Sequence, residues 1–158
     1  MASAPLVDLS TIDLNQIIAT REQIYEVLPH RYEFMQLDGL IYFDVEKRLA
    51  VALRNVRPDE FWVRGHVPGR PLLPGVLMIE TAAQLAAYLT MRVVPELGHF
   101  WGFGGVEDVK FRMAVSPPAR LYFLLHCTEL RPRRSTAEVQ AILDGRLAFE
   151  GRVIGMPV

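Results

Sequence analysis

Apolar and polar residues alternate along several short stretches of the chain, and this pattern predicts a strand-rich domain. Two strands are predicted over 37–44 and 48–57, joined by a hairpin at 45–47. Turn residues rich in Pro and Gly separate the remaining candidates. Four further strands are predicted in this second half of the chain, over 100–112, 120–131, 136–144 and 146–154. The pattern therefore indicates about six strands, mostly antiparallel.

One long stretch follows helical periodicity instead. It runs from Pro74, which suits the first turn of a helix because it lacks an N–H, to about Val93. Its residues are apolar on nearly every side, which is typical of a helix that is buried on most sides. An α+β domain follows, in which the antiparallel sheet wraps around this one buried helix.

The N-terminal part of the chain predicts a second, shorter helix. Ser10 or Thr11 could cap it, a partial apolar stripe continues it, and Pro29 would stop it after about Val27. Residues 1–9 are expected to form a loose tail. No repeat, linker or low-complexity tract divides the chain, so we expect a single domain over 1–158.

Composition and charge exclude several classes of protein. Hydrophobic residues make up 51% and charged residues 22% of 158 residues, which is typical of a globular domain large enough to bury a core. The net charge of −1 gives no general case for binding nucleic acid or an anionic membrane. The N-terminal residues lack a signal-peptide pattern, and Glu80 and Gln84 interrupt the long helix as a membrane span. A cytoplasmic protein is therefore expected.

Cys127 is the only cysteine, which excludes an internal disulfide and a cysteine zinc site. It lies in an apolar run, so we expect a buried thiol. The four histidines have no ligand spacing typical of a metal site; they are His30, His66, His99 and His126. Neither a Gly-rich phosphate loop nor a nucleophile elbow is present. Neither a metal nor another cofactor is therefore expected.

The stretch 65–84 carries the candidate chemistry. His66 lies in a stiff Gly/Pro loop, where a preorganised imidazole can act as a general base near neutral pH. Glu80 lies inside the apolar helix, with Gln84 one turn further on the same face, where Gln84 could hold the carboxyl group in position. Between them, the free N–H groups at Gly75 could bind a carbonyl oxygen that acquires negative charge. The alternatives are a loop histidine that only bonds a neighbour, and a structural Glu80 neutralised by an arginine such as Arg112.

These residues resemble the signature of the FabZ type of 3-hydroxyacyl-[acyl-carrier-protein] dehydratase, a family with the hotdog fold. The matching positions are Gly65-His66-Val67-Pro68-Gly69-Arg70-Pro71-Leu72-Leu73-Pro74-Gly75-Val76, followed by Glu80-Thr81-Ala82-Ala83-Gln84. Further matches are Leu28-Pro29-His30-Arg31-Tyr32, Asn55-Val56 and Phe103-x-Gly105-Val106. The resemblance extends from about Leu28 to the last strand.

The resemblance implies dehydration of carrier-bound 3-hydroxyacyl thioesters in fatty-acid biosynthesis. His66 would remove the α-proton, Glu80 would help the hydroxyl group leave, and Gly75, with Val76 and Gln84 beside it, would bind the thioester. Trp101 and Phe103 are candidates for the lining of the acyl tunnel. His66 of one subunit would work with Glu80 of another, so the resemblance implies a homodimer, which could assemble further into a trimer of dimers. The Val67–Pro68 bond is a candidate cis peptide bond.

The acyl carrier protein is the implied partner, and Arg131, Arg133 and Arg134 are candidates for its contact. Some positions depart from the family pattern: Glu33, Val67, Met113-Ala114 and Ser116-Pro117-Pro118-Ala119. Two alternative functions therefore stay open. One is a hotdog hydrolase of acyl thioesters, and the other is a non-catalytic paralogue that binds acyl groups or the carrier.

Overall fold

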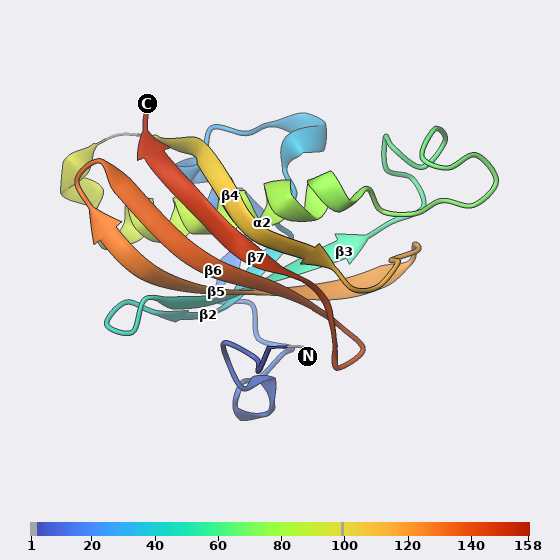
Figure 1. Ribbon diagram of the computed structural model, residues 1–158, viewed down its shortest axis with the longest axis horizontal. Coiled ribbons are helices and arrows are strands. Elements are labelled where there is room, and N and C mark those ends of the chain that lie inside the picture. Colours follow the sequence, from blue (N-terminus) through green and yellow to red (C-terminus); the bar gives the residue numbers. More distant parts are fainter. Residues whose placement is uncertain (1–2, 99) are drawn as a thin grey trace.

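A seven-stranded antiparallel sheet curves around one long helix in the computed structural model, which describes residues 3–98 and 100–158 (Figure 1). The strand order is β1-β2-β3-β5-β6-β7-β4, so β4 forms one edge. The strands are β1 (Ala19–Thr20), β2 (Gly39–Asp44), β3 (Leu49–Val56), β4 (Trp101–Phe111), β5 (Ala119–Arg131), β6 (Arg134–Leu143) and β7 (Arg146–Pro157). This is the α+β hotdog arrangement that the sequence predicted, with the two-residue β1 added to the six expected strands.

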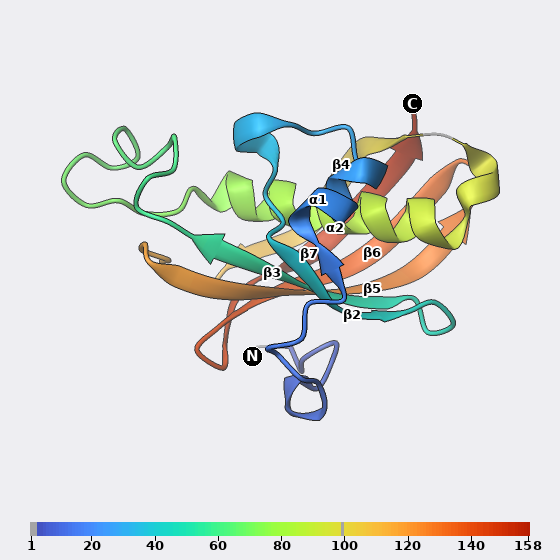
Figure 2. The same ribbon diagram turned by 180° about the vertical axis from the view of Figure 1, so that it is seen from behind.

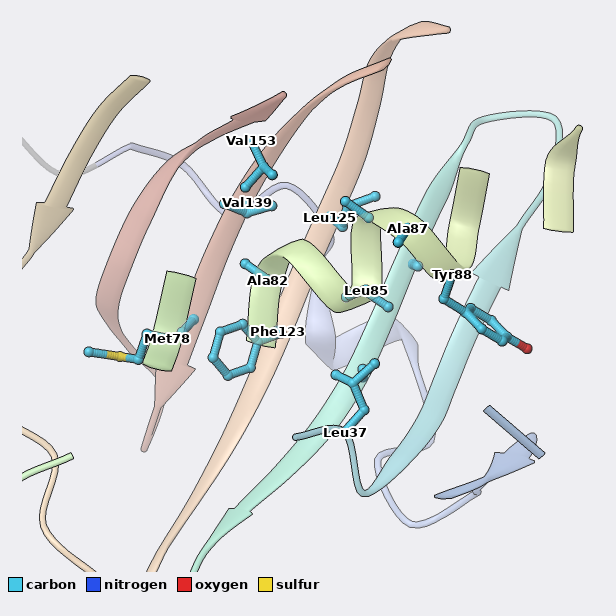
Figure 3. Packing of buried hydrophobic residues seen from close by; sticks show 14 of the residues in the cluster. Leu37, Met78, Ala82, Leu85, Ala87, Tyr88, Phe123, Leu125, Val139 and Val153 are labelled. Carbon is cyan, nitrogen blue, oxygen red and sulfur yellow. The ribbon is translucent and has the colours of Figure 1, made fainter. Parts of the chain in front are cut away.

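The long helix, α2, spans Gly75–Val93 with Pro74 at its N-cap, as predicted. Its apolar residues pack against the concave face of the sheet (Figures 1 and 2). Figure 3 shows Ala82 and Leu85 of the helix facing strand residues such as Phe123 and Val139, all of them buried. Because apolar burial contributes roughly 25 cal/mol per Å², this layer is the main source of stability of the fold. It also fixes the position of the polar residues that α2 carries.

The N-terminal helix is shorter than predicted. It is α1, Arg21–Val27, and a capping box between Thr20 and Gln23 starts it. Neither Ser10 nor Thr11 caps it, so that prediction was wrong. The residues before it form a 3-10 turn (Leu9–Thr11) and β1. Here Asp8 and Asp13 accept hydrogen bonds from nearby backbone N–H groups, which competes with a continuous helix.

Residues 3–9 also depart from the expected loose tail, because they pack on the outer face of the sheet. The side chain of Gln140 holds them by two hydrogen bonds. Its Oε1 accepts from Leu6 N at 2.8 Å, and its Nε2 donates to Ala4 O at 2.9 Å. Val7 is buried there in a second hydrophobic cluster. The buried members of that cluster are Val7, Ile41, Val51, Leu53, Leu124 and Ile142. The N-terminal segment therefore shields these apolar side chains on the outer face of the sheet from solvent.

Smaller features agree with the sequence pattern. The register of β4 against β7 shifts between Phe103 and Gly105, which is a bulge in a glycine-rich part of the strand. Cys127 is buried, as expected, and burial raises the pKa of its thiol. Two further 3-10 turns span Tyr32–Phe34 and Pro95–Leu97. No helix within residues 3–98 and 100–158 is long and apolar enough to cross a membrane.

Candidate active site

His66 lies in the long loop between β3 and α2, which projects beyond the N-terminal end of α2 (the green loop in Figure 1). Both its backbone and its ring are held: its N–H donates to Trp62 O at 2.8 Å, and its Nδ1 lies 2.7 Å from Leu72 O. A carbonyl oxygen can only accept, so in the neutral ring Nδ1 carries the proton. Nε2 is then left with a free lone pair on an exposed ring, as a general base requires.

The base of this loop is fixed by a buried ion pair. Arg54 Nη2 donates to Glu60 Oε1 at 2.5 Å, and the two side chains are only 4% and 8% exposed. Glu60 also accepts from Arg57 N at 2.7 Å and from Trp62 Nε1 at 3.3 Å. Since Trp62 O in turn binds the N–H of His66, the carboxylate of Glu60 positions the histidine through the loop. A cis peptide bond lies at His66–Val67, one residue before the predicted Val67–Pro68, and a second lies at Pro117–Pro118.

Glu80 lies on the face of α2 that borders a cleft, with its side chain 22% exposed. Gln84 Nε2 donates to Glu80 Oε1 at 2.8 Å, as the helical spacing predicted. Gln84 itself is buried, and Tyr25 Oη donates to its Oε1 at 2.6 Å. Tyr25 Oη also accepts from Leu37 N at 2.8 Å. The glutamate is therefore oriented by a chain of buried hydrogen bonds that reaches α1.

His30 is a second titratable group beside Glu80. Its Nε2 lies 3.7 Å from Glu80 Oε1, and its ring meets those of Tyr25 and Phe100 edge-on. Burial lowers the pKa of His30, the charge of Glu80 raises it, and that of Arg31 lowers it; the net shift is downward. The ring is therefore neutral at pH 7. Sequence reasoning missed this neighbour, although Leu28–Tyr32 was among the family matches.

The cleft beside Glu80 runs between α2 and the strands β4, β6 and β7. Trp101 and Phe103, the two candidates for the acyl tunnel, line it together with Gln84. The complete lining is His30, Glu80, Ala83, Gln84, Ala86, Ala87, Phe100, Trp101, Gly102, Phe103, Ser135, Val153, Ile154 and Gly155. His66 is not among these residues. Within one chain, the structure therefore does not bring His66 and Glu80, the candidate base and acid, into one cleft.

Gly75 and Val76 begin α2, where the backbone N–H groups have no partner inside the helix. A Cβ at Gly75 would lie 2.9 Å from the ring of Phe111, so the position has room for glycine alone unless that ring moves. The side chain of Val76 is 69% exposed. Val76 is therefore exposed, whereas the Phe111 ring packs against Gly75, and neither position lines the Glu80 cleft.

Arg112 does not neutralise Glu80, because it forms an ion pair with Glu150. Arg112 is therefore not the arginine that the structural alternative would need beside Glu80. Within the described residues, no group of three or more His, Cys, Asp or Glu side chains could hold a metal ion. His99 lies outside the described residues.

Comparison with known proteins places this geometry in context. A family model described as the FabA-like domain matches residues 28–155. The chain is 35% identical over 132 residues to the 3-hydroxyacyl-[acyl-carrier-protein] dehydratase FabZ of Herpetosiphon aurantiacus, covering 84% of this chain and 93% of that protein. It is 36% identical over 137 residues to the FabZ of Alkaliphilus metalliredigens, covering 87% and 89%.

The fold is also similar to that of solved structures. The dehydratase heterocomplex ApeI:P from Xenorhabdus doucetiae aligns with a TM-score of 0.73 at 16% identity, over 85% of this chain and 90% of that one. At this level of identity the likeness concerns the fold alone.

Proposed function

Because the chain belongs to the FabA-like domain family, we propose that it dehydrates 3-hydroxyacyl thioesters carried on acyl carrier protein to trans-2-enoyl thioesters in fatty-acid biosynthesis. Its similarity to FabZ enzymes extends over most of both chains, so its reaction class is that of a dehydratase. Such an enzyme acts where carrier-bound substrates are made, and we infer a cytoplasmic location. The observation that carries the assignment of roles is the geometry of His66 and Glu80.

His66 is the base in this proposal. Its Nδ1–H is engaged by Leu72 O, so Nε2 removes the C2 proton of the substrate. The electron pair of the broken C–H bond forms the C2–C3 double bond, and the hydroxyl group at C3 leaves. Glu80 donates the proton that turns this hydroxyl into water. Gln84 holds Oε1 of Glu80, which directs Oε2 and its proton toward the cleft.

Negative charge that develops on the thioester oxygen is stabilised at the start of α2. The N–H groups of Gly75 and Val76 belong to the first turn, where the helix dipole also favours negative charge. Donors that are fixed before the reaction need no reorganisation when charge develops.

The active site requires two subunits in this proposal. His66 is on a projecting loop and Glu80 borders a cleft that the loop of the same chain does not line. The edge strand β4 carries exposed apolar side chains, among them Phe111 and Phe103, and Phe103 also lines this cleft. Pairing of two copies at this edge would cover them and would deliver His66 of one copy to Glu80 of the other. A trimer of such dimers is a further step that the same proposal allows.

The carrier protein is the proposed partner for the basic turn between β5 and β6. Arg131, Arg133 and Arg134 gather there, and Glu129 is the acidic neighbour, 3.7 Å from Arg131 and 3.8 Å from Arg134. This turn directly precedes Ser135, which lines the cleft. An acidic carrier bound at the turn would therefore present its acyl thioester to the cleft.

The decisive experiment measures hydration of crotonyl-carrier by the wild-type protein and by His66→Ala and Glu80→Gln. Loss of a general base or acid costs about 10²- to 10⁴-fold in kcat. Mixing the two inactive variants should restore activity, because the mixed dimer contains one intact site. Full activity of His66→Ala would reject the assigned role. Faster release of free thiol from a saturated acyl thioester than hydration would identify a thioesterase instead, and carrier binding without either reaction would identify a non-catalytic paralogue.

A further inference from the structure

Ser135 brings a hydroxyl group into an otherwise largely apolar part of the cleft. The residue is 4% exposed and lines the same cleft as Glu80. No residue in 3–98 or 100–158 forms a hydrogen bond with its Oγ. Because Ser135 lines the cleft, this hydroxyl is available to form a hydrogen bond with a bound ligand.

The residue opposite Ser135 leaves space for that hydroxyl. Ser135 pairs with Gly155 across β6 and β7, and a Cβ at Gly155 would lie 2.5 Å from Ser135 Oγ. The same Cβ would lie 3.5 Å from the Trp101 ring. Any larger residue at 155 would therefore displace the hydroxyl. Ser135 and Gly155 together form a small polar niche in the wall of the cleft, called the 135/155 niche below.

The niche lies between the proposed reacting group and a basic turn. The cleft includes Glu80 and extends to Ser135, and the next residue outward is Arg134, at the turn with Arg131 and Arg133. A phosphopantetheine arm has a thioester at one end, two amides along its length and a phosphate at the other end. A thioester at Glu80, an amide at Ser135 and the phosphate at the arginines match this order. An unsubstituted alkyl chain would leave Ser135 without a partner.

We propose that the Ser135 hydroxyl binds an amide of the pantetheine arm and so positions the thioester, while Gly155 keeps the niche open. The proposal rests on the dehydratase function and adds a positioning residue to it. The cleft between α2 and β6 is then the path of the arm, so Trp101 and Phe103, which line the same cleft, would face the arm and not the acyl chain that the sequence resemblance implied for them.

The test compares two crotonyl thioesters that differ only in the thiol, pantetheine and ethanethiol. Ser135→Ala should raise KM for crotonyl-pantetheine about 3- to 10-fold, the effect of one hydrogen bond, with kcat little changed. KM for the S-ethyl thioester, which has no amide, should stay as in the wild type. Ser116→Ala, which alters an exposed serine in the turn before β5, is the control and should change neither value.

Binding gives a readout that does not depend on turnover. Calorimetry with butyryl-pantetheine, a saturated analogue that cannot be dehydrated, should give a Kd raised by the same factor in Ser135→Ala. If wild-type protein binds this analogue in the expected way but hydrates no enoyl thioester, the proposed function fails and the role of Ser135 stands. Equal Kd values for the two proteins would overturn the role of Ser135. An effect that appears with long acyl chains on either thiol would assign Ser135 to the acyl path instead, and would also overturn it.

A second pair of variants tests Gly155. Gly155→Ala should raise KM for crotonyl-pantetheine in the wild-type background, because the new Cβ displaces Ser135 Oγ. In the Ser135→Ala background the same change should add little, since the hydroxyl is already absent. Equal effects in both backgrounds would show that residue 155 acts by obstructing the cleft, and would overturn the niche.

Discussion

Gln84 donates a hydrogen bond from Nε2 to Oε1 of Glu80 one helical turn away. The other donor and acceptor sites of its amide group also form hydrogen bonds. Nε2 donates to Phe34 O at 2.8 Å, and Oε1 accepts from Tyr25 Oη at 2.6 Å and from Gln36 N at 3.3 Å. These partners fix the orientation of the amide. If it were reversed, its oxygen would face the acceptors and its nitrogen would face the donors. Glu80 therefore receives a donor on one oxygen and has its second oxygen free for proton transfer.

Replacing Gln84 should damage both stability and catalysis. Gln84→Ala leaves the buried Tyr25 hydroxyl and the N–H of Gln36 with one acceptor fewer, so the free energy of unfolding should fall by about 1–3 kcal/mol. It also frees the carboxyl group of Glu80, so kcat for hydration should fall about tenfold or more. Chemical denaturation and steady-state kinetics measure the two effects.

Tyr25→Phe is the matched control for this prediction. It removes the hydroxyl group on the far side of Gln84 but keeps the contact between Gln84 and Glu80. Stability should fall by a similar amount, while kcat should fall less than in Gln84→Ala. Undiminished kcat in Gln84→Ala would contradict the positioning role.

Glu60 offers a second test, because it anchors the loop that holds His66. Its buried ion pair with Arg54 would be broken in Glu60→Ala, leaving the guanidinium without its counterion, and loss of one partner of a buried pair costs about 3–5 kcal/mol. Asp59→Ala is the control, because the neighbouring carboxylate is 76% exposed in its pair with Arg57, and its loss should change stability little. Similar melting temperatures for the two variants would disprove the anchoring role.

The sequence predicted the large elements well because each had a strong periodic signal. The helix 75–93 is apolar on nearly every side, so burial alone determines it. The N-terminal helix had only a partial apolar stripe. There, Asp8 and Asp13 bind the local backbone and delay the helix to Arg21, a competition that periodicity does not reveal.

The site was predictable where the interaction is local in sequence. Gln84 and Glu80 are four residues apart on one helix, and their contact follows from helix geometry. His30 reaches Glu80 from another segment, and Gly155 faces Ser135 through strand register. Such pairings depend on the tertiary fold, and no spacing in the sequence indicates them.

The stability of the fold should depend on pH through His30. Its folded-state pKa lies below the ordinary value of about 6.5, because burial disfavours the charged ring. The unfolded chain therefore binds more protons than the folded chain below pH 6.5. The free energy of unfolding should have its full value above pH 6.5 and should fall as the pH drops from there toward the folded-state pKa. Below that interval the loss should level off, with a slope of at most about 1.4 kcal/mol per pH unit within it.

Urea denaturation of wild-type protein and His30→Phe between pH 7.5 and 5 measures this contribution. The variant has no imidazole to titrate. Its free energy of unfolding should therefore fall less than that of the wild-type protein as the pH falls. Glu80 and Arg31 are the charged groups that act on His30. A difference that stays constant over the range would show that His30 titrates alike in both states.

The N-terminal segment should detach when its grip on the sheet is removed. The buried amide of Gln140 holds both Ala4 O and Leu6 N, so Gln140→Ala removes two hydrogen bonds and should cost about 1–3 kcal/mol. Hydrogen exchange at Leu6 should accelerate, whereas exchange in α2 should not, because local opening of an edge segment leaves the core closed. The segment lies outside the residues 28–155 that match the family, so hydration of crotonyl-carrier should stay near the wild-type rate. A loss of activity as large as that of Gln84→Ala would show instead that the outer face communicates with the cleft.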